Sequence, residues 1–166
     1  MSLHDELLMQ AERLAKLEPK HPRQASLRRA TSTAYYALFH LLIHEATTAL
    51  VDDPGLQKLV PRAFAHGEMK QACEQFREDR KFPDQLKAIS LPALSDDLKT
   101  VANAFIRLQE NRHAADYDVS RTFNSTDTAA SLQTAREAFE AWDRVRGQQI
   151  ATVFLVNLLL GSKWKR

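Results

Sequence analysis

A short polar stretch near residue 112 carries the side chains best suited to chemistry. Arg112 and His113 are adjacent, and Asp116 and Tyr117 follow within one helical turn. An arginine binds a phosphate group through parallel N–H donors, and a histidine exchanges protons near neutral pH. Arg112 and Asp116 are spaced to pair with each other on one side of a helix. The stretch therefore predicts either a polar functional site or a charged pair that fixes the register of a helix.

The helix expected over residues 95–116 leads into this stretch along an apolar stripe. At about 100° of rotation per residue, one face carries Leu98, Val101, Ala102, Phe105 and Leu108. Continued along the helix, the same face reaches Arg112 and Asp116. Burying such a pair is costly unless its members are hydrogen-bonded. We therefore expect a small, enclosed polar site at the inner end of this helix.

A second helix, expected over residues 23–51, supplies candidate groups opposite that site. Tyr35 lies on its inner face, and Glu45 falls on the same stripe, which makes Glu45 the predicted partner of Arg112. Tyr36, Phe39 and Ile43 extend the apolar surface beyond a single stripe. The helix is therefore either central to the fold or exposes a face to another subunit.

Other polar residues predict no further chemistry. His40 and His44 have the spacing of two metal ligands on a helix, but no HExxH motif is present and both project away from the inner stripe. We expect a solvated or interface pair, no metal site and no cofactor. The single cysteine, Cys73, excludes a disulfide framework and is typical of a reducing, cytoplasmic location. No apolar run is long enough to cross a membrane, and no export signal is expected.

Composition predicts long helices in a single domain. The 166 residues include only four glycines, and 23 Lys and Arg residues nearly balance 21 Asp and Glu residues. Apolar periodicity and turn residues place further helices at 3–17, within 56–79 and at 125–146, with an apolar segment at 150–160. Segments 82–94 and 117–124 are expected to be irregular. The predicted fold is all-α: one up-and-down bundle of four to five helices over residues 1–166, with its core at about 23–160.

Two stretches together resemble the HEPN superfamily of small α-helical bundles. Residues 29–40 read RATSTAYYALFH, and residues 108–118 read LQENRHAADYD; both are similar to helices of that family and occur in the same order. Many members are metal-independent ribonucleases of toxin–antitoxin, abortive-infection or CRISPR systems. The resemblance implies a pair at a dimer cleft, an arginine followed after four to six residues by a histidine. That pair promotes attack of a ribose 2′-hydroxyl on the adjacent phosphate.

This chain departs from the family's catalytic pattern. Arg107 and His113 have the permitted spacing, but the apolar Leu108 follows Arg107, which points almost opposite to the inner face. Arg112 has the right face, yet Tyr117 stands where its histidine is expected. The resemblance therefore implies a bundle whose catalytic pair is incomplete.

Three functions follow from these patterns. The preferred prediction is a non-catalytic, nucleotide- or RNA-associated interaction module of a toxin–antitoxin or defence system. Its polar site comprises Arg112, Asp116 and Tyr117, with Tyr35 and Glu45 opposite. One alternative is a metal-independent endoribonuclease, with Arg112 as phosphate clamp and His113 as proton-transfer group. Another is the structural partner subunit of a two-gene module, bound to a protein from a neighbouring gene. A homodimer through apolar helical faces is expected.

Overall fold

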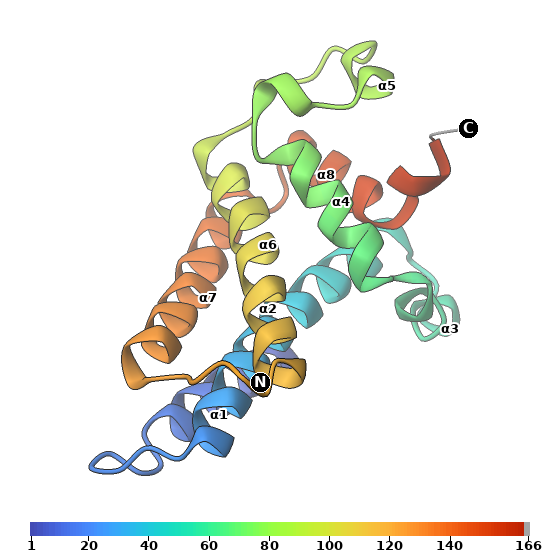
Figure 1. Cartoon of the computed structure of the whole chain (residues 1–166). Coiled ribbons are helices and arrows are strands. Elements are labelled where there is room, and N and C mark those ends of the chain that lie inside the picture. The colour runs from blue at the N-terminus through green and yellow to red at the C-terminus, as the bar shows by residue number, and fades with distance from the viewer. Residues whose placement is uncertain (165–166) are drawn as a thin grey trace. The chain divides into compact units, whose positions relative to one another are not determined.

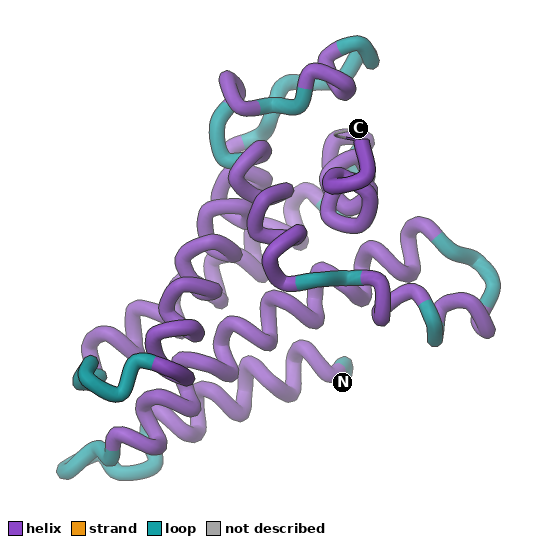
Figure 2. The backbone as a smooth tube through the Cα atoms, turned by 45° about the vertical axis from the view of Figure 1, so that its right-hand side comes forward, coloured by secondary structure: helices purple, strands orange, loops and turns teal. Residues whose placement is uncertain are grey.

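The computed structural model describes residues 1–164 and is built from helices (Figure 1). The α-helices of this part are α1 (Leu3–Ala15), α2 (Gln24–Leu50), α3 (Pro54–Gln57), α4 (His66–Phe76), α5 (Asp84–Lys87), α6 (Asp96–Tyr117), α7 (Ser125–Val145) and α8 (Gln149–Leu160). Three 3₁₀ turns accompany them, η1 (Val60–Ala63), η2 (Asp79–Lys81) and η3 (Gly161–Trp164). No strand occurs in the described residues (Figure 2). The all-α prediction is confirmed, with more helices than the four or five expected. Residues 165 and 166 of the predicted domain lie outside the described part.

Local chemistry determines where α1 starts and where α7 ends. Before α1, the Ser2 hydroxyl accepts the Asp5 backbone N–H at 3.3 Å, and the Asp5 carboxylate accepts the Ser2 backbone N–H at 3.3 Å. This reciprocal capping satisfies donors that the helix itself leaves unpaired. Beyond the end of α7, Gly147 adopts a φ of 82°, a left-handed conformation that glycine adopts without steric cost. Both boundaries agree with the sequence predictions.

The described chain forms two compact units. Unit 1 comprises Met1–His40 and Ala104–Glu140, and unit 2 comprises Leu41–Asn103 and the residues from Ala141 onward. Each of α2, α6 and α7 contributes one stretch to each unit. The single domain expected over residues 1–166 stays a prediction.

Unit 1 contains α1 and parts of α2, α6 and α7. α1 is tied to α7 because the Arg136 guanidinium donates to the Glu12 carboxylate at 2.7 Å. The ring of His4 also lies 6.0 Å from the ring of Phe139. The α2 stretch of this unit is buried on nearly all sides, including Phe39 at 8% exposure. Of the two alternatives for this helix, the structure therefore shows the central one.

Unit 2 is organised around α4 and α8. Phe154 of α8 lies 5.1 Å from Phe76 of α4, measured between ring centroids. The Asn157 side-chain amide donates to Gln75 at 3.0 Å. A Cβ at Gly161 would lie 2.6 Å from the side-chain Oδ1 of Asn157, so the glycine permits this close approach. The segment predicted to be irregular, 82–94, contains only the short α5. Within the part of the chain that the structure describes, no helix combines the length and apolar character of a membrane span.

Candidate functional site

The Arg112 guanidinium lies among the three tyrosines of the chain. Its Cζ is 5.4 Å from the ring centroid of Tyr35, 5.9 Å from that of Tyr36 and 5.9 Å from that of Tyr117. Aromatic rings at such distances attract a cation through the negative potential of their faces. Only 11% of the Arg112 side chain is exposed. Aromatic contacts therefore hold this arginine at the edge of the unit 1 core.

Polar contacts use little of the hydrogen-bonding capacity of Arg112. Its Nη1 lies 3.7 Å from Oδ2 of Asp116, which is an ion pair longer than a normal hydrogen bond. The same carboxylate oxygen accepts a hydrogen bond from the Ser32 hydroxyl at 3.2 Å. The buried Nε of Arg112 has no hydrogen-bond partner within residues 1–164. Donor capacity thus remains for a further acceptor.

The site is formed where the last turns of α6 pack against α2 in unit 1 (Figure 1). Tyr35 and Tyr36 are consecutive on α2, so their rings approach Arg112 from different directions. Asp116 and Tyr117 follow Arg112 by one turn of α6, which brings all three to the same end of the helix. The predicted grouping of Arg112, Asp116, Tyr117 and Tyr35 is present in the structure.

The loop after α6 is held in place by two side chains of α2. Arg28 donates hydrogen bonds to the carbonyl oxygens of Ala115, Asp118 and Arg121. Gln24 both donates to the Phe123 carbonyl at 2.6 Å and accepts the Phe123 backbone N–H at 2.9 Å. These contacts span about ninety positions of sequence. They fix the end of α6 that carries Tyr117.

One side of the site is open, contrary to the enclosed site expected. Tyr117 is 64% exposed, and His113 is also exposed. Their rings lie 5.0 Å apart and form an aromatic surface beside Arg112. The apolar stripe of α6 runs out one turn before the helix ends, which explains the opening.

Glu45 does not take the role predicted for it. Its carboxylate accepts a hydrogen bond from Nη2 of Arg146 at 3.0 Å, and both residues belong to unit 2. Glu45 lies ten residues after Tyr35 on α2. That separation is about 15 Å along a helix axis. The carboxylate that pairs with Arg112 is Asp116, from the same helix.

Three residues of the site were missed from the sequence. Tyr36 was assigned to a broad apolar face, although its pairing with Tyr35 in a chain of only three tyrosines was a usable signal. Ser32 and Arg28 carry no recognisable motif. Their roles depend on contacts with residues more than eighty positions away.

Electrostatics in the adjoining loop favour a charged carboxylate. The Ser120 hydroxyl and backbone N–H both donate to Oδ1 of Asp118, at 2.6 and 3.0 Å. These hydrogen bonds lower the pKa of the Asp118 carboxyl. The loop therefore keeps its turn-forming carboxylate ionised well below neutral pH.

The histidines of α2 lie in different surroundings. His40 is half-buried against Phe39, with ring centroids 5.4 Å apart, and burial lowers the pKa of its imidazole. His44 is exposed. Among the described residues, no group of three or more His, Cys, Asp or Glu side chains could hold a metal ion.

Unit 2 presents a separate apolar groove of about 530 Å³. Its apolar lining comes from α5 and the residues just after it, from α8 and from the end of η3, and consists of Leu86, Ile89, Val153, Val156 and Trp164. The partner protein expected from a neighbouring gene stays a prediction. Within unit 2, this groove is the surface whose character suits such a partner.

The Arg112 site combines a cation, an exposed aromatic surface and a nearby carboxylate. This set can bind an anion with an attached planar ring, since a guanidinium takes phosphate oxygens and an aromatic ring stacks on a base. No family model, curated protein or solved structure matches the chain, so its function is inferred from this arrangement and from the two sequence motifs.

Proposed function

We propose that the chain is a HEPN-like, cytoplasmic module of a toxin–antitoxin or defence system that binds RNA or a nucleotide without cleaving it. The observation that carries the proposal is the largely buried Arg112 guanidinium, held by three tyrosines, one of which, Tyr117, is exposed. The two stretches similar to HEPN helices contribute all three tyrosines and the arginine. Motif resemblance and site geometry therefore converge on one place.

Phosphate binding at this site requires Arg112 to exchange one partner for another. Its ion pair with Asp116 is long, so a phosphate oxygen can form shorter, charge-assisted hydrogen bonds to the guanidinium. The negative charge of Asp116 repels a phosphate. The hydrogen bond that Asp116 accepts from Ser32 of α2 keeps its carboxylate directed toward α2. A base attached to the phosphate then stacks on Tyr117. The proposal thus assigns a distinct role to each side chain.

Arg112→Ala is expected to weaken binding of a labelled single-stranded RNA about tenfold, because one charge-assisted phosphate contact is lost. Arg112→Lys is expected to restore little, since an ammonium lacks the planar fork. Asp116→Asn removes the competing charge and is expected to strengthen binding. Fluorescence anisotropy at low salt measures all three variants.

Arg107→Ala is the matched control for this experiment. Arg107 is exposed on the same helix, five residues before Arg112, and represents the other possible match to the family's arginine. We expect its RNA affinity to stay within about twofold of wild type. Equal losses for Arg107→Ala and Arg112→Ala would contradict a specific site and indicate general electrostatic attraction.

The ribonuclease alternative has one observation in its favour. His113 directly follows Arg112, and its ring lies against Tyr117 beside the site. Its exposed imidazole is able to reach a bound phosphodiester. Tyr117, at the position of the family's histidine, carries a phenol, which exchanges its proton poorly near neutral pH.

We expect the wild-type protein to leave single-stranded RNA intact in the presence of EDTA, because the site lacks a second proton-transfer group. Gel analysis of a labelled RNA after prolonged incubation measures this. The non-catalytic proposal fails if wild type cleaves the RNA while both Arg112→Ala and His113→Ala do not. Cleavage that persists in both variants would indicate a contaminating nuclease, because the variants are purified in the same way as the wild type.

A further inference from the structure

Helix α1 carries two apolar seams instead of one. The inner seam, His4, Leu8, Ala11 and Ala15, has spacings of four, three and four, and Ala11 at its centre is fully buried. The outer seam, Leu3, Leu7, Gln10 and Leu14, repeats the same spacings one residue earlier. Leu3 is 55% exposed, and Leu17, which continues the seam beyond the helix, is 61% exposed. A seam of this period is typical of a helix that packs against another helix.

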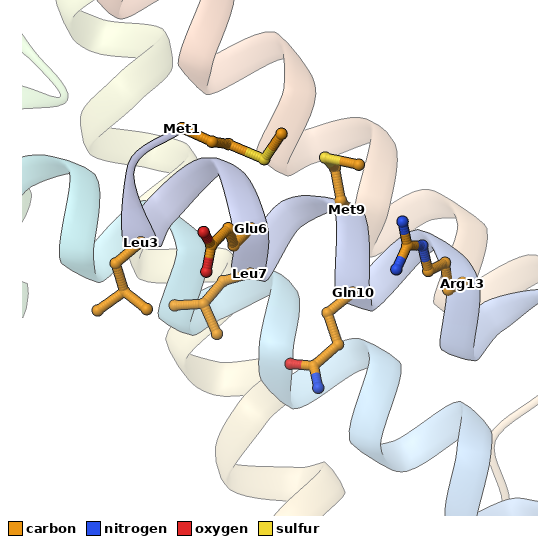
Figure 3. A pocket seen from close by; sticks show the side chains of 7 residues that line it. All are labelled: Met1, Leu3, Glu6, Leu7, Met9, Gln10 and Arg13. Carbon is orange, nitrogen blue, oxygen red and sulfur yellow. The ribbon is translucent and has the colours of Figure 1, made fainter.

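A shallow hollow of about 450 Å³ lies over the outer seam (Figure 3). Its lining consists of Met1, two residues before α1, and of six residues of the helix: Leu3, Glu6, Leu7, Met9, Gln10 and Arg13. In Figure 3, Leu3, Leu7 and Gln10 extend to the same side of the helix. Among residues 1–164, the Glu6, Gln10 and Arg13 side chains have no ion pair or hydrogen bond. This face therefore has apolar and polar groups without partners among the described residues.

We propose that the outer seam of α1 packs against the same seam of a second copy, with the two helices antiparallel about a two-fold axis at Gln10. Glu6 and Arg13 occupy equivalent positions of successive seven-residue repeats, on the same flank of the seam. In an antiparallel pair, each such flank faces its own equivalent. Glu6 of each copy then meets Arg13 of the other, which forms two ion pairs related by symmetry.

The other orientation lacks this match. In a parallel pair, the flank of Glu6 faces the opposite flank of the partner, where Ala11 is buried in the inner seam. The antiparallel pair also brings the leucines at one end of the seam, Leu3 and Leu7, onto those at the other end, Leu14 and Leu17. Gln10 meets Gln10 of the second copy at the axis, where each side-chain amide is able to donate and accept. Charge complementarity thus selects a second copy as occupant and fixes the register.

Sedimentation velocity of the full chain between about 5 and 200 µM tests this interface, because a seam of four turns suits a weak dimer. Wild type is expected to show a concentration-dependent dimer. Glu6→Arg and Arg13→Glu each place like charges opposite one another, and each is expected to lower the association constant at least about tenfold. The double variant, E6R with R13E, exchanges the partners and is expected to return to within about threefold of wild type.

Glu74→Arg makes the same charge reversal on an exposed position of α4, and we expect it to dimerise as wild type does. Far-UV circular dichroism confirms that each variant is folded. A monomeric wild type at the highest concentration overturns the proposal and leaves the face to a different partner. If either single variant dimerises as strongly as wild type, the interface lies elsewhere and the proposal is overturned. Failure of the double variant to recover overturns the antiparallel register. None of these outcomes depends on RNA binding at Arg112.

Discussion

Replacing Arg28 with alanine is expected to lower the free energy of unfolding by about 3 kcal/mol, since a hydrogen bond to a charged group contributes about 1.5–3 kcal/mol and the site is partly exposed. Arg28 donates to Ala115 at 2.9 Å, to Asp118 at 3.0 Å and to the carbonyl of Arg121. A single side chain thus satisfies one carbonyl in the last turn of α6 and two carbonyls of the following loop. The bond to Ala115 is partly buried, so truncation leaves that carbonyl without its donor, whereas water can reach the two exposed loop carbonyls.

Urea unfolding followed by circular dichroism measures this loss, and trypsin cleavage after Arg121 reports on the loop itself. The Arg121 side chain lies over the ring of Phe123, with its Cζ 4.7 Å from the centroid. We expect slow cleavage in wild type and rapid cleavage in Arg28→Ala. Arg29→Ala, at the exposed neighbouring position, is expected to change stability by less than about 0.5 kcal/mol. Similar effects of the two substitutions would contradict the clamp.

The helices of this chain were predictable because their causes are local. Apolar spacing, the Ser2–Asp5 cap and the glycine at position 147 all act over a few residues, and the helices expected at 3–17 and 125–146 lie within two residues of those bounds. The residues at the end of α6 were also predictable, because the apolar face of this helix continues to Arg112 and Asp116. What these patterns determine is which residues share a helix face.

They do not determine which residues of two helices lie at the same height. Glu45 shares a stripe with residues near Tyr35, yet it pairs with Arg146 in unit 2. Arg28 and Gln24 likewise contact a loop about ninety positions away. Such contacts depend on how far one helix is displaced along another, and helical periodicity carries no information about that displacement. Whether the Arg112 site is open or enclosed depends on the same displacement of one helix along another.

Tyr35→Ala is expected to be the most destabilising substitution at the site, costing about 3–5 kcal/mol of unfolding free energy. Tyr35 is fully buried, and its ring lies 5.5 Å from Phe105 of α6 and 5.8 Å from Phe39. Removing the ring leaves a cavity between α2 and α6 within unit 1, directly beneath Arg112. Because the same ring supports the guanidinium, stability and the position of Arg112 are linked.

Two further variants separate the ring's packing from its other contacts. Tyr35→Phe keeps the aromatic face toward Arg112 and is expected to cost less than about 1.5 kcal/mol, the net value of one hydrogen bond. Tyr36→Ala truncates a half-buried ring and is expected to cost about 1–2 kcal/mol, since less apolar surface is lost. Equilibrium urea unfolding gives all three values. A loss below about 1 kcal/mol for Tyr35→Ala would mean that the α2–α6 contact in unit 1 does not rest on this ring. In that case the tyrosines surrounding Arg112 would serve binding and not the fold, and Tyr35→Ala would impair RNA affinity in a protein of nearly wild-type stability.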